Sequence, residues 1–84
     1  MNANYLYDIF ETTRKCGAPD LTIGLAMLKT GRPIPDGMTD EGVRQFLGRH
    51  YEALSKAYRT GDRQFFADTV AAILAQAEAN GEEK

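Results

Sequence analysis

The sequence predicts a small all-α, four-helix protein folded as a single domain. Apolar residues recur at helical spacing in four segments, and a residue suited to capping a helix N-terminus precedes each of them. Glycine or proline separates the segments. A chain of 84 residues fits one domain, which we expect to cover residues 1–84 with a frayed tail at residues 81–84. The predicted helices are about residues 4–16, 21–30, 40–59 and 63–80.

The first two predicted helices differ in how their apolar residues are arranged. The first has one apolar face, and Gly17 ends it. The second, which Asp20 caps, has apolar residues on nearly every side. They are Leu21, Ile23, Leu25, Ala26, Met27 and Leu28. A helix of this kind lies at the centre of a fold or is covered by a partner, so we expect one of these two positions for it.

The second half of the chain is predicted to form a helical hairpin. Residues 31–38 contain two prolines and two glycines, which exclude regular helix and make this segment an ordered connector. Thr39 caps the next helix, whose apolar stripe stays in phase through Gly48, and we therefore predict one continuous helix over residues 40–59. A short turn then leads into the last helix, over residues 63–80, which packs against the preceding one.

The composition limits the classes of function that we consider. Ten Lys and Arg residues stand against twelve Asp and Glu residues, a net charge of −2, whereas nucleic-acid binders usually have a basic excess. Residues 1–10 lack the basic stretch and apolar run of a signal peptide, and no stretch approaches about 18 apolar residues. We therefore expect a cytoplasmic protein with no membrane association, and nucleic acid is a disfavoured partner.

The sequence offers no catalytic set. Nucleophilic catalysis needs a nucleophile, a base and an orienting group, and the only cysteine and the only histidine are Cys16 and His50. We interpret Cys16 as a small buried residue at a helix end and His50 as a histidine at the edge of the core. Two residues are too few for a zinc site, and neither a Glu-x-x-His pair nor a nucleotide-binding P-loop occurs. We expect no catalytic residue, no metal, no cofactor and no enzymatic activity.

An interface with another protein is the function that the sequence supports best. Tyr5 and Tyr7 lie two positions apart in one helix and point in different directions, so at least one of them is expected to be exposed. Tyrosine is common at interfaces because it buries area and keeps a polar tip. With Ile23 and Met27 of the apolar second helix, these tyrosines form a candidate protein interface. We predict a non-enzymatic helical protein-binding module, such as an adaptor, inhibitor or regulatory accessory protein, which binds another protein or a second copy of itself as a homodimer.

One segment, residues 38–61, points to a different function. It has a capping threonine, two apolar residues four positions apart, a Leu-Gly pair and a further apolar residue in the middle of the following segment. These are Thr39, Val43, Leu47, Gly48 and Leu54. In this pattern the segment resembles the helix-turn-helix of phage repressor and Cro-type regulators, in which a turn separates two helices and the second enters the DNA major groove.

The resemblance covers under a third of the chain and departs from the family pattern at two places. Arg44 stands where the family has a small residue, and Arg49 stands where it has an apolar one. The resemblance implies that the DNA contacts come from Arg49, Tyr51, Glu52, Ser55 and Lys56. A DNA-binding transcriptional regulator that uses residues 39–59 is therefore the alternative function. The backbone at Gly48 distinguishes the two functions, since the regulator requires a turn there and the protein-binding module is compatible with a continuous helix.

Overall fold

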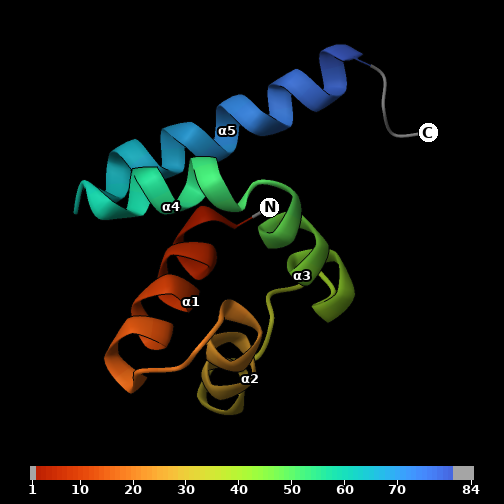
Figure 1. The fold of residues 1–84 in the computed structure, drawn as a ribbon. Helices are drawn as coiled ribbons and strands as arrows, with labels where there is room; N and C mark the ends of the chain where they lie inside the picture. The colour runs from red at the N-terminus through yellow and green to blue at the C-terminus, as the bar shows by residue number, and fades with distance from the viewer. Residues whose placement is uncertain (1, 81–84) are drawn as a thin grey trace.

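The computed structural model describes residues 2–80, with side chains as far as residue 77 (Figure 1). Over these residues the chain forms five α-helices and no strand. They are α1 (Ala3–Cys16), α2 (Leu21–Gly31), α3 (Asp40–Arg49), α4 (Tyr51–Arg59) and α5 (Arg63–Asn80). The predicted all-α class is confirmed, and no helix in the described part is long and apolar enough to cross a membrane. The frayed tail expected at residues 81–84 lies outside the described residues.

The predicted continuous helix over residues 40–59 is wrong, because the chain bends at His50 and forms α3 and α4. His50 has φ −117° and ψ 27°, outside the helical region. Hydrogen bonds persist on both sides of it, from its own N–H to the Phe46 carbonyl (3.1 Å) and from the Leu54 N–H to the His50 carbonyl (3.0 Å). A straight helix of this length would extend about 30 Å, whereas α1, the helix it would pack on, is about 21 Å long. The bend allows both α3 and α4 to contribute to one core.

Capping side chains set the helix boundaries, as the sequence predicts. Four side-chain oxygens each accept hydrogen bonds from backbone N–H groups in the first turn of the next helix. They belong to Asn2, Asp20, Thr39 and Asp62. Gly17, at φ 66°, ends α1 in the left-handed conformation, and its N–H donates back to the last turn of the helix. These helix ends are therefore decided within a few residues of sequence, whereas α4 begins after His50 without a side-chain cap.

The centre of the fold is α1, which lies between α2 on one side and the α4–α5 hairpin on the other (Figure 1). Five residues of α1 are buried, whereas α2 buries only Gly24 and Leu25. The apolar core consists of Tyr5, Leu6, Tyr7, Ile9, Phe10, Leu25, Val43, Leu47, Leu54, Ala57, Phe66 and Val70. A central position for α2 is therefore ruled out within this chain, and the covering of α2 by a partner stays a prediction.

Both N-terminal tyrosines are buried, so the prediction that at least one of them is exposed is wrong. Tyr5 is 1% exposed, and its hydroxyl donates to the Arg32 carbonyl at 2.7 Å. Tyr7 is 6% exposed and meets Tyr58 and Phe66 edge-on, at centroid distances of 5.1 and 5.3 Å. The prediction assumed that α1 has one covered face. Because α1 is covered on two opposite sides, side chains that point in different directions are both buried.

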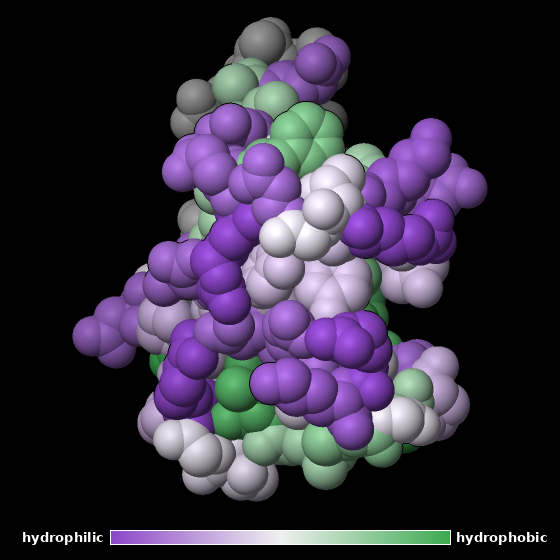
Figure 2. All heavy atoms as spheres, turned by 90° about the vertical axis from the view of Figure 1, so that its left-hand side faces the viewer, coloured by the Kyte–Doolittle hydropathy of each residue, from purple (hydrophilic) through white to green (hydrophobic). Residues whose placement is uncertain are grey.

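The exposed side of α2 carries the other two residues of the predicted interface. Ile23 is 40% exposed, and Met27, one turn later, is 46% exposed. Figure 2 shows a hydrophobic band along the lower edge of the molecule, at the level of α2 in Figure 1. Of the four residues predicted for a protein interface, these two lie on the surface of the chain.

Asp8 ties α1 to two later parts of the chain. Its carboxylate accepts hydrogen bonds from Arg32, at 2.5 Å, and from Arg63, at 3.1 Å. Arg63 also lies over the Tyr7 ring, 4.2 Å from its centroid. Partial burial raises the pKa of Asp8, but the bonds from the two guanidinium groups outweigh it and hold this pKa below its ordinary value. The connector after α2 and the start of α5 are thereby held against α1.

Candidate functional site

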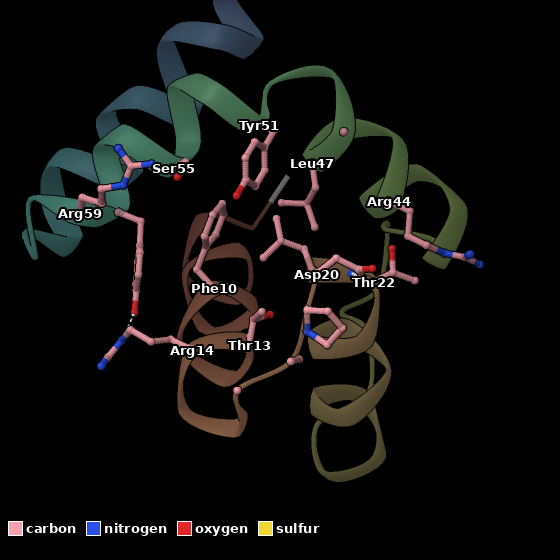
Figure 3. A pocket seen from close by; sticks show the side chains of 16 residues that line it. Phe10, Thr13, Arg14, Asp20, Thr22, Arg44, Leu47, Tyr51, Ser55 and Arg59 are labelled. Carbon is pink, nitrogen blue, oxygen red and sulfur yellow. Dashed lines mark hydrogen bonds between the residues drawn. The ribbon is translucent and has the colours of Figure 1, made fainter.

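An open groove of about 780 Å³ lies between α1, the turn that follows it, α3 and α4 (Figure 3). Its volume falls in the range of typical ligand sites. The groove exists because α3 and α4 take different directions from His50, while α1 and the turn after it, residues 17–20, form the opposite wall. The bend that the sequence does not predict therefore creates the site.

Aromatic rings form the centre of this groove. The Phe10 ring stacks on Tyr58, with centroids 5.3 Å apart, and on Tyr51, with centroids 6.3 Å apart. Tyr51 is 51% exposed and is the first residue of α4, so the bend at His50 sets the direction of its ring. In Figure 3, Tyr51, Phe10 and Leu47 lie together in the middle of the groove. This centre offers an apolar stacking surface to the side chain of a ligand.

The edge of the groove on α4 is polar. Tyr51, Ser55 and Arg59 follow one another at four-residue spacing, so they share one face of the helix. Ser55 is 8% exposed, while Arg59 is exposed. Among the described residues, Arg59 makes no ion pair with a carboxylate. This edge therefore presents two hydroxyl groups and an uncompensated guanidinium group over two helical turns.

Arg14 lies at the same end of the groove and is held in a hydrogen-bonded group with Tyr58 and Glu11. Its Nε donates to the Tyr58 hydroxyl at 2.7 Å, and its Nη2 donates to Glu11 at 2.9 Å. The Tyr58 hydroxyl donates to the same carboxylate at 3.0 Å. The bond from Arg14 holds the pKa of Glu11 below its usual range, and burial raises the pKa of Tyr58. The charge of Arg14 is thus compensated within the chain.

The opposite end of the groove carries charges of both signs. Arg44 donates to Asp40 at 2.5 Å, and Asp40 also pairs with Lys29. The hydrogen bonds from Lys29 and from Arg44 hold the pKa of Asp40 below its usual range. Asp20 lines this side of the groove (Figure 3), where it caps α2. Arg14 and Arg44 each pair with a carboxylate, so Arg59 is the arginine of the groove without such a partner among the described residues.

The structure separates the residues that the helix-turn-helix resemblance places on DNA. Tyr51 and Ser55 line the groove, whereas three others are exposed outside it, namely Arg49, Glu52 and Lys56. Gly48 lies within α3 and is not among the described glycines with positive φ. The interruption comes two residues after this glycine, so the backbone does not turn at the Leu-Gly pair.

The sequence analysis does not identify Phe10 or Tyr58 as site residues. Once α4 is known to begin at Tyr51, the spacing of Tyr51, Ser55 and Arg59 indicates a shared face. For Phe10 the sequence contains no such signal, because its contacts with α4 join residues more than 40 positions apart.

Cys16 and His50 lie in different parts of the molecule. Cys16 is exposed at the end of α1, so the prediction that it is buried is wrong, because its side of the last turn is left uncovered, as are its neighbours Lys15 and Gly17. The His50 ring packs against Phe46, with centroids 4.9 Å apart, and lines a separate cavity of about 310 Å³ beside α5. In the part of the chain that the structure describes, no group of three His, Cys, Asp or Glu residues is placed to hold a metal ion.

Together, the fold and the groove define a small all-α globule with an open groove that combines an aromatic centre with a cationic edge. No protein-family model matches this chain, and the comparisons with curated proteins and with solved structures find no significant match.

Proposed function

We propose that this protein is a non-enzymatic binding module for another protein, and that its partner binds in the groove between α1, α3 and α4. The observation that carries the proposal is Tyr51, a half-exposed aromatic ring that stacks on buried Phe10 in the centre of a concave site. Exposed tyrosines in concave, partly apolar sites are typical of the residues that dominate protein interfaces.

A binding function is favoured over catalysis by the lining of the groove. Ser55 lines the groove as a potential nucleophile, but the histidine of the chain, His50, lines the other cavity. A serine without a neighbouring base is a weak nucleophile at neutral pH. Ser55 is therefore better suited to donate a hydrogen bond to a bound partner.

The alternative, a DNA-binding regulator that uses residues 39–59, is supported by the exposure of Arg49 and Lys56. Nucleic-acid affinity comes largely from neutralised phosphates, and the net charge of −2 opposes it. We expect duplex DNA to bind weakly and only at low salt. Tight, sequence-specific binding at physiological salt that Lys56→Glu abolishes would support the regulator instead.

Selection from a displayed library of random short peptides tests the protein-binding function. We expect peptides that bind the wild-type protein and are lost from the Tyr51→Ala variant, because the substitution removes the exposed ring of the groove. Phe65→Ala is the matched control: Phe65 is 49% exposed, close to the 51% of Tyr51, but it lies on α5 outside the groove. Peptides that bind both variants equally, or no selected peptides, would contradict the proposal.

The proposal includes self-association through the exposed side of α2. Ile23 and Met27 leave apolar area in contact with water, and a symmetric dimer is the commonest way for a small protein to cover such a surface. The same two residues from a second copy would then meet across the dimer axis. This surface lies on α2 and does not include the aromatic centre of the groove.

A further inference from the structure

We infer that the segment bound in the groove is acidic: a stretch of another protein that places an apolar side chain on the aromatic centre and a carboxylate on Arg59. This inference rests on the proposed function and names the chemistry of the partner. It is carried by the charge of the groove, by the arrangement of hydrogen-bonding groups along α4, and by the way the neighbouring arginines are already paired.

One end of the groove carries a local positive charge, although the protein as a whole is acidic. The lining of the groove includes four charged side chains, three of them arginines: Arg14, Arg44, Arg59 and Asp20. The whole chain, in contrast, has a net charge of −2. Field lines concentrate in a concave site, so a local excess of one sign attracts a ligand segment of the opposite sign even when the total charge does not. An acidic segment is therefore attracted to the Arg59 end of the groove.

Arg59 is the arginine available to a ligand. Arg14 is engaged with Glu11, and Arg44 is engaged with Asp40. A guanidinium group binds a carboxylate through two parallel hydrogen bonds, a geometry that a lysine does not reproduce. These pairings assign the carboxylate of the partner to the Arg59 end of the groove.

The spacing along α4 sets where the apolar anchor lies relative to this carboxylate. Arg59 lies eight positions after Tyr51, a distance of about 12 Å along the helix axis. An extended ligand spans this distance in about four residues, since each adds about 3.3 Å. Ser55 lies between the two positions and can donate its hydroxyl to a backbone carbonyl of the ligand. The partner segment is therefore expected to carry an aromatic or leucine side chain and an acidic residue about four positions apart when extended.

A nucleic acid matches the groove less well than an acidic peptide. A strand of nucleic acid presents a row of phosphates, and its binding depends on neutralising several of them. Within residues 2–77 the groove offers one guanidinium group without an ion pair, at Arg59, and Asp20 lies toward the other end (Figure 3). One cation beside an aromatic surface suits one carboxylate beside one apolar side chain.

Two synthetic peptides test the inference by fluorescence anisotropy. Both carry phenylalanine at the anchor position, and they differ only in having glutamate or lysine four positions away and at the flanks. The acidic peptide should bind about tenfold more tightly at low salt, since close charge pairs across an interface are worth this much or more. The difference should shrink at physiological salt, because exposed charges are screened.

Charge reversal identifies the residue responsible. Arg59→Glu should weaken binding of the acidic peptide about tenfold and strengthen binding of the basic peptide, so that the variant prefers the basic one. Lys56→Glu is the matched control, because Lys56 is exposed on the same helix but does not line the groove. Lys56→Glu should change the affinity for either peptide by less than about twofold, since a charge at position 56 acts on the ligand only over a longer, screened distance. Both positions are exposed, so thermal melts of the two variants should coincide.

The outcomes separate this inference from the proposed function. Library peptides that depend on Tyr51 but show no acidic preference, or an acidic preference that Arg59→Glu leaves unchanged, would overturn the inference and leave the protein-binding function standing. A short oligonucleotide that binds more tightly than the acidic peptide at physiological salt would also overturn it. An absence of any Tyr51-dependent peptide would remove the proposed function and the inference together.

Discussion

Gly24 on α2 lies directly against Thr13 on α1, so closely that a Cβ atom added to Gly24 would stand 1.8 Å from the Thr13 Oγ1 atom. The Thr13 hydroxyl is itself fixed, since it donates to the Ile9 carbonyl at 2.7 Å. This contact is where α2 approaches the central helix, and the absence of a side chain at Gly24 permits the approach. The pair therefore determines how α2 is positioned, and with it the wall of the groove that Asp20 and Leu21 form.

Gly24→Ala should destabilise the protein although alanine is the better helix former. We expect a loss of about 1–3 kcal/mol, since the added methyl group overlaps a hydroxyl that cannot move without breaking its hydrogen bond. Gly48→Ala is the matched control, because Gly48 is helical and has no neighbour within 4 Å of the added atom. It should stabilise the fold by about 0.5–1 kcal/mol. Urea unfolding of the two variants measures both effects, and equal stabilisation would contradict the observed packing.

A double variant separates the Thr13 contact from other effects of Gly24→Ala. Thr13→Ala removes the Oγ1 atom. The nearest atoms to the added carbon are then the Cβ of residue 13, at 3.0 Å, and the Ile9 carbonyl oxygen, at 3.1 Å. We therefore expect Thr13→Ala/Gly24→Ala to be less destabilised than the sum of the single variants, with a coupling free energy of about 1 kcal/mol. Strict additivity would show that Thr13 is not what the added methyl group meets.

Asp8→Asn should lower the free energy of unfolding at neutral pH and should make that free energy depend less on pH. The folded pKa of Asp8 lies below its ordinary value of 3.8, so its ion pairs stabilise the fold above that pH and are lost as the pH falls through the folded pKa. We expect the free energy of unfolding to fall by about 1 kcal/mol at neutral pH. The loss is no larger because Arg32 and Arg63 are half-exposed and solvent screens their charges. Thermal melts from neutral to acidic pH measure the difference, which should vanish at the acidic end. Asp36→Asn, at an exposed position of the connector, is the control, and parallel profiles for Asp8→Asn and wild type would contradict the prediction.

The two buried tyrosines should respond differently to loss of the hydroxyl. Tyr5→Phe removes the hydrogen bond to the Arg32 carbonyl and should lower the free energy of unfolding by about 1 kcal/mol. Tyr7→Phe should stay within about 0.5 kcal/mol of wild type, because its ring makes the contacts and no hydrogen bond of its hydroxyl is found among the described residues. Denaturant unfolding measures both values. Equal costs for the two substitutions would contradict the different surroundings of the two side chains.

Met27→Asp should reduce self-association without unfolding the chain. Met27 is 46% exposed, so a charge there meets water in the monomer but is buried across a dimer that forms through α2. We expect the wild-type protein to have the mass of two chains at micromolar concentration by light scattering, and the variant to have the mass of one. Phe65→Asp, at a similarly exposed residue of α5, should leave the dimer intact. A wild-type monomer throughout this range would exclude the dimer.

Local features of the sequence predict most helix ends correctly. Asp20, Thr39 and Asp62 cap the helices that the sequence analysis starts after them, and Gly17 ends α1. These predictions succeed because a cap is made between residues two or three positions apart, so the chain needs no other element to form it. The bend at His50 has no such signal, because backbone hydrogen bonds continue on both sides of it.

The sequence by itself determined the helical class, the caps and which residues are apolar, since each of these depends on neighbours along the chain. Only the tertiary structure decided that α1 is the central helix, that Tyr5 and Tyr7 are both buried, and that Phe10 lies under Tyr51. Periodicity shows which sides of a helix avoid water but does not show which element covers each side. That choice depends on the combined packing of all five helices, in which Gly24 permits one close approach and the bend at His50 opens the groove.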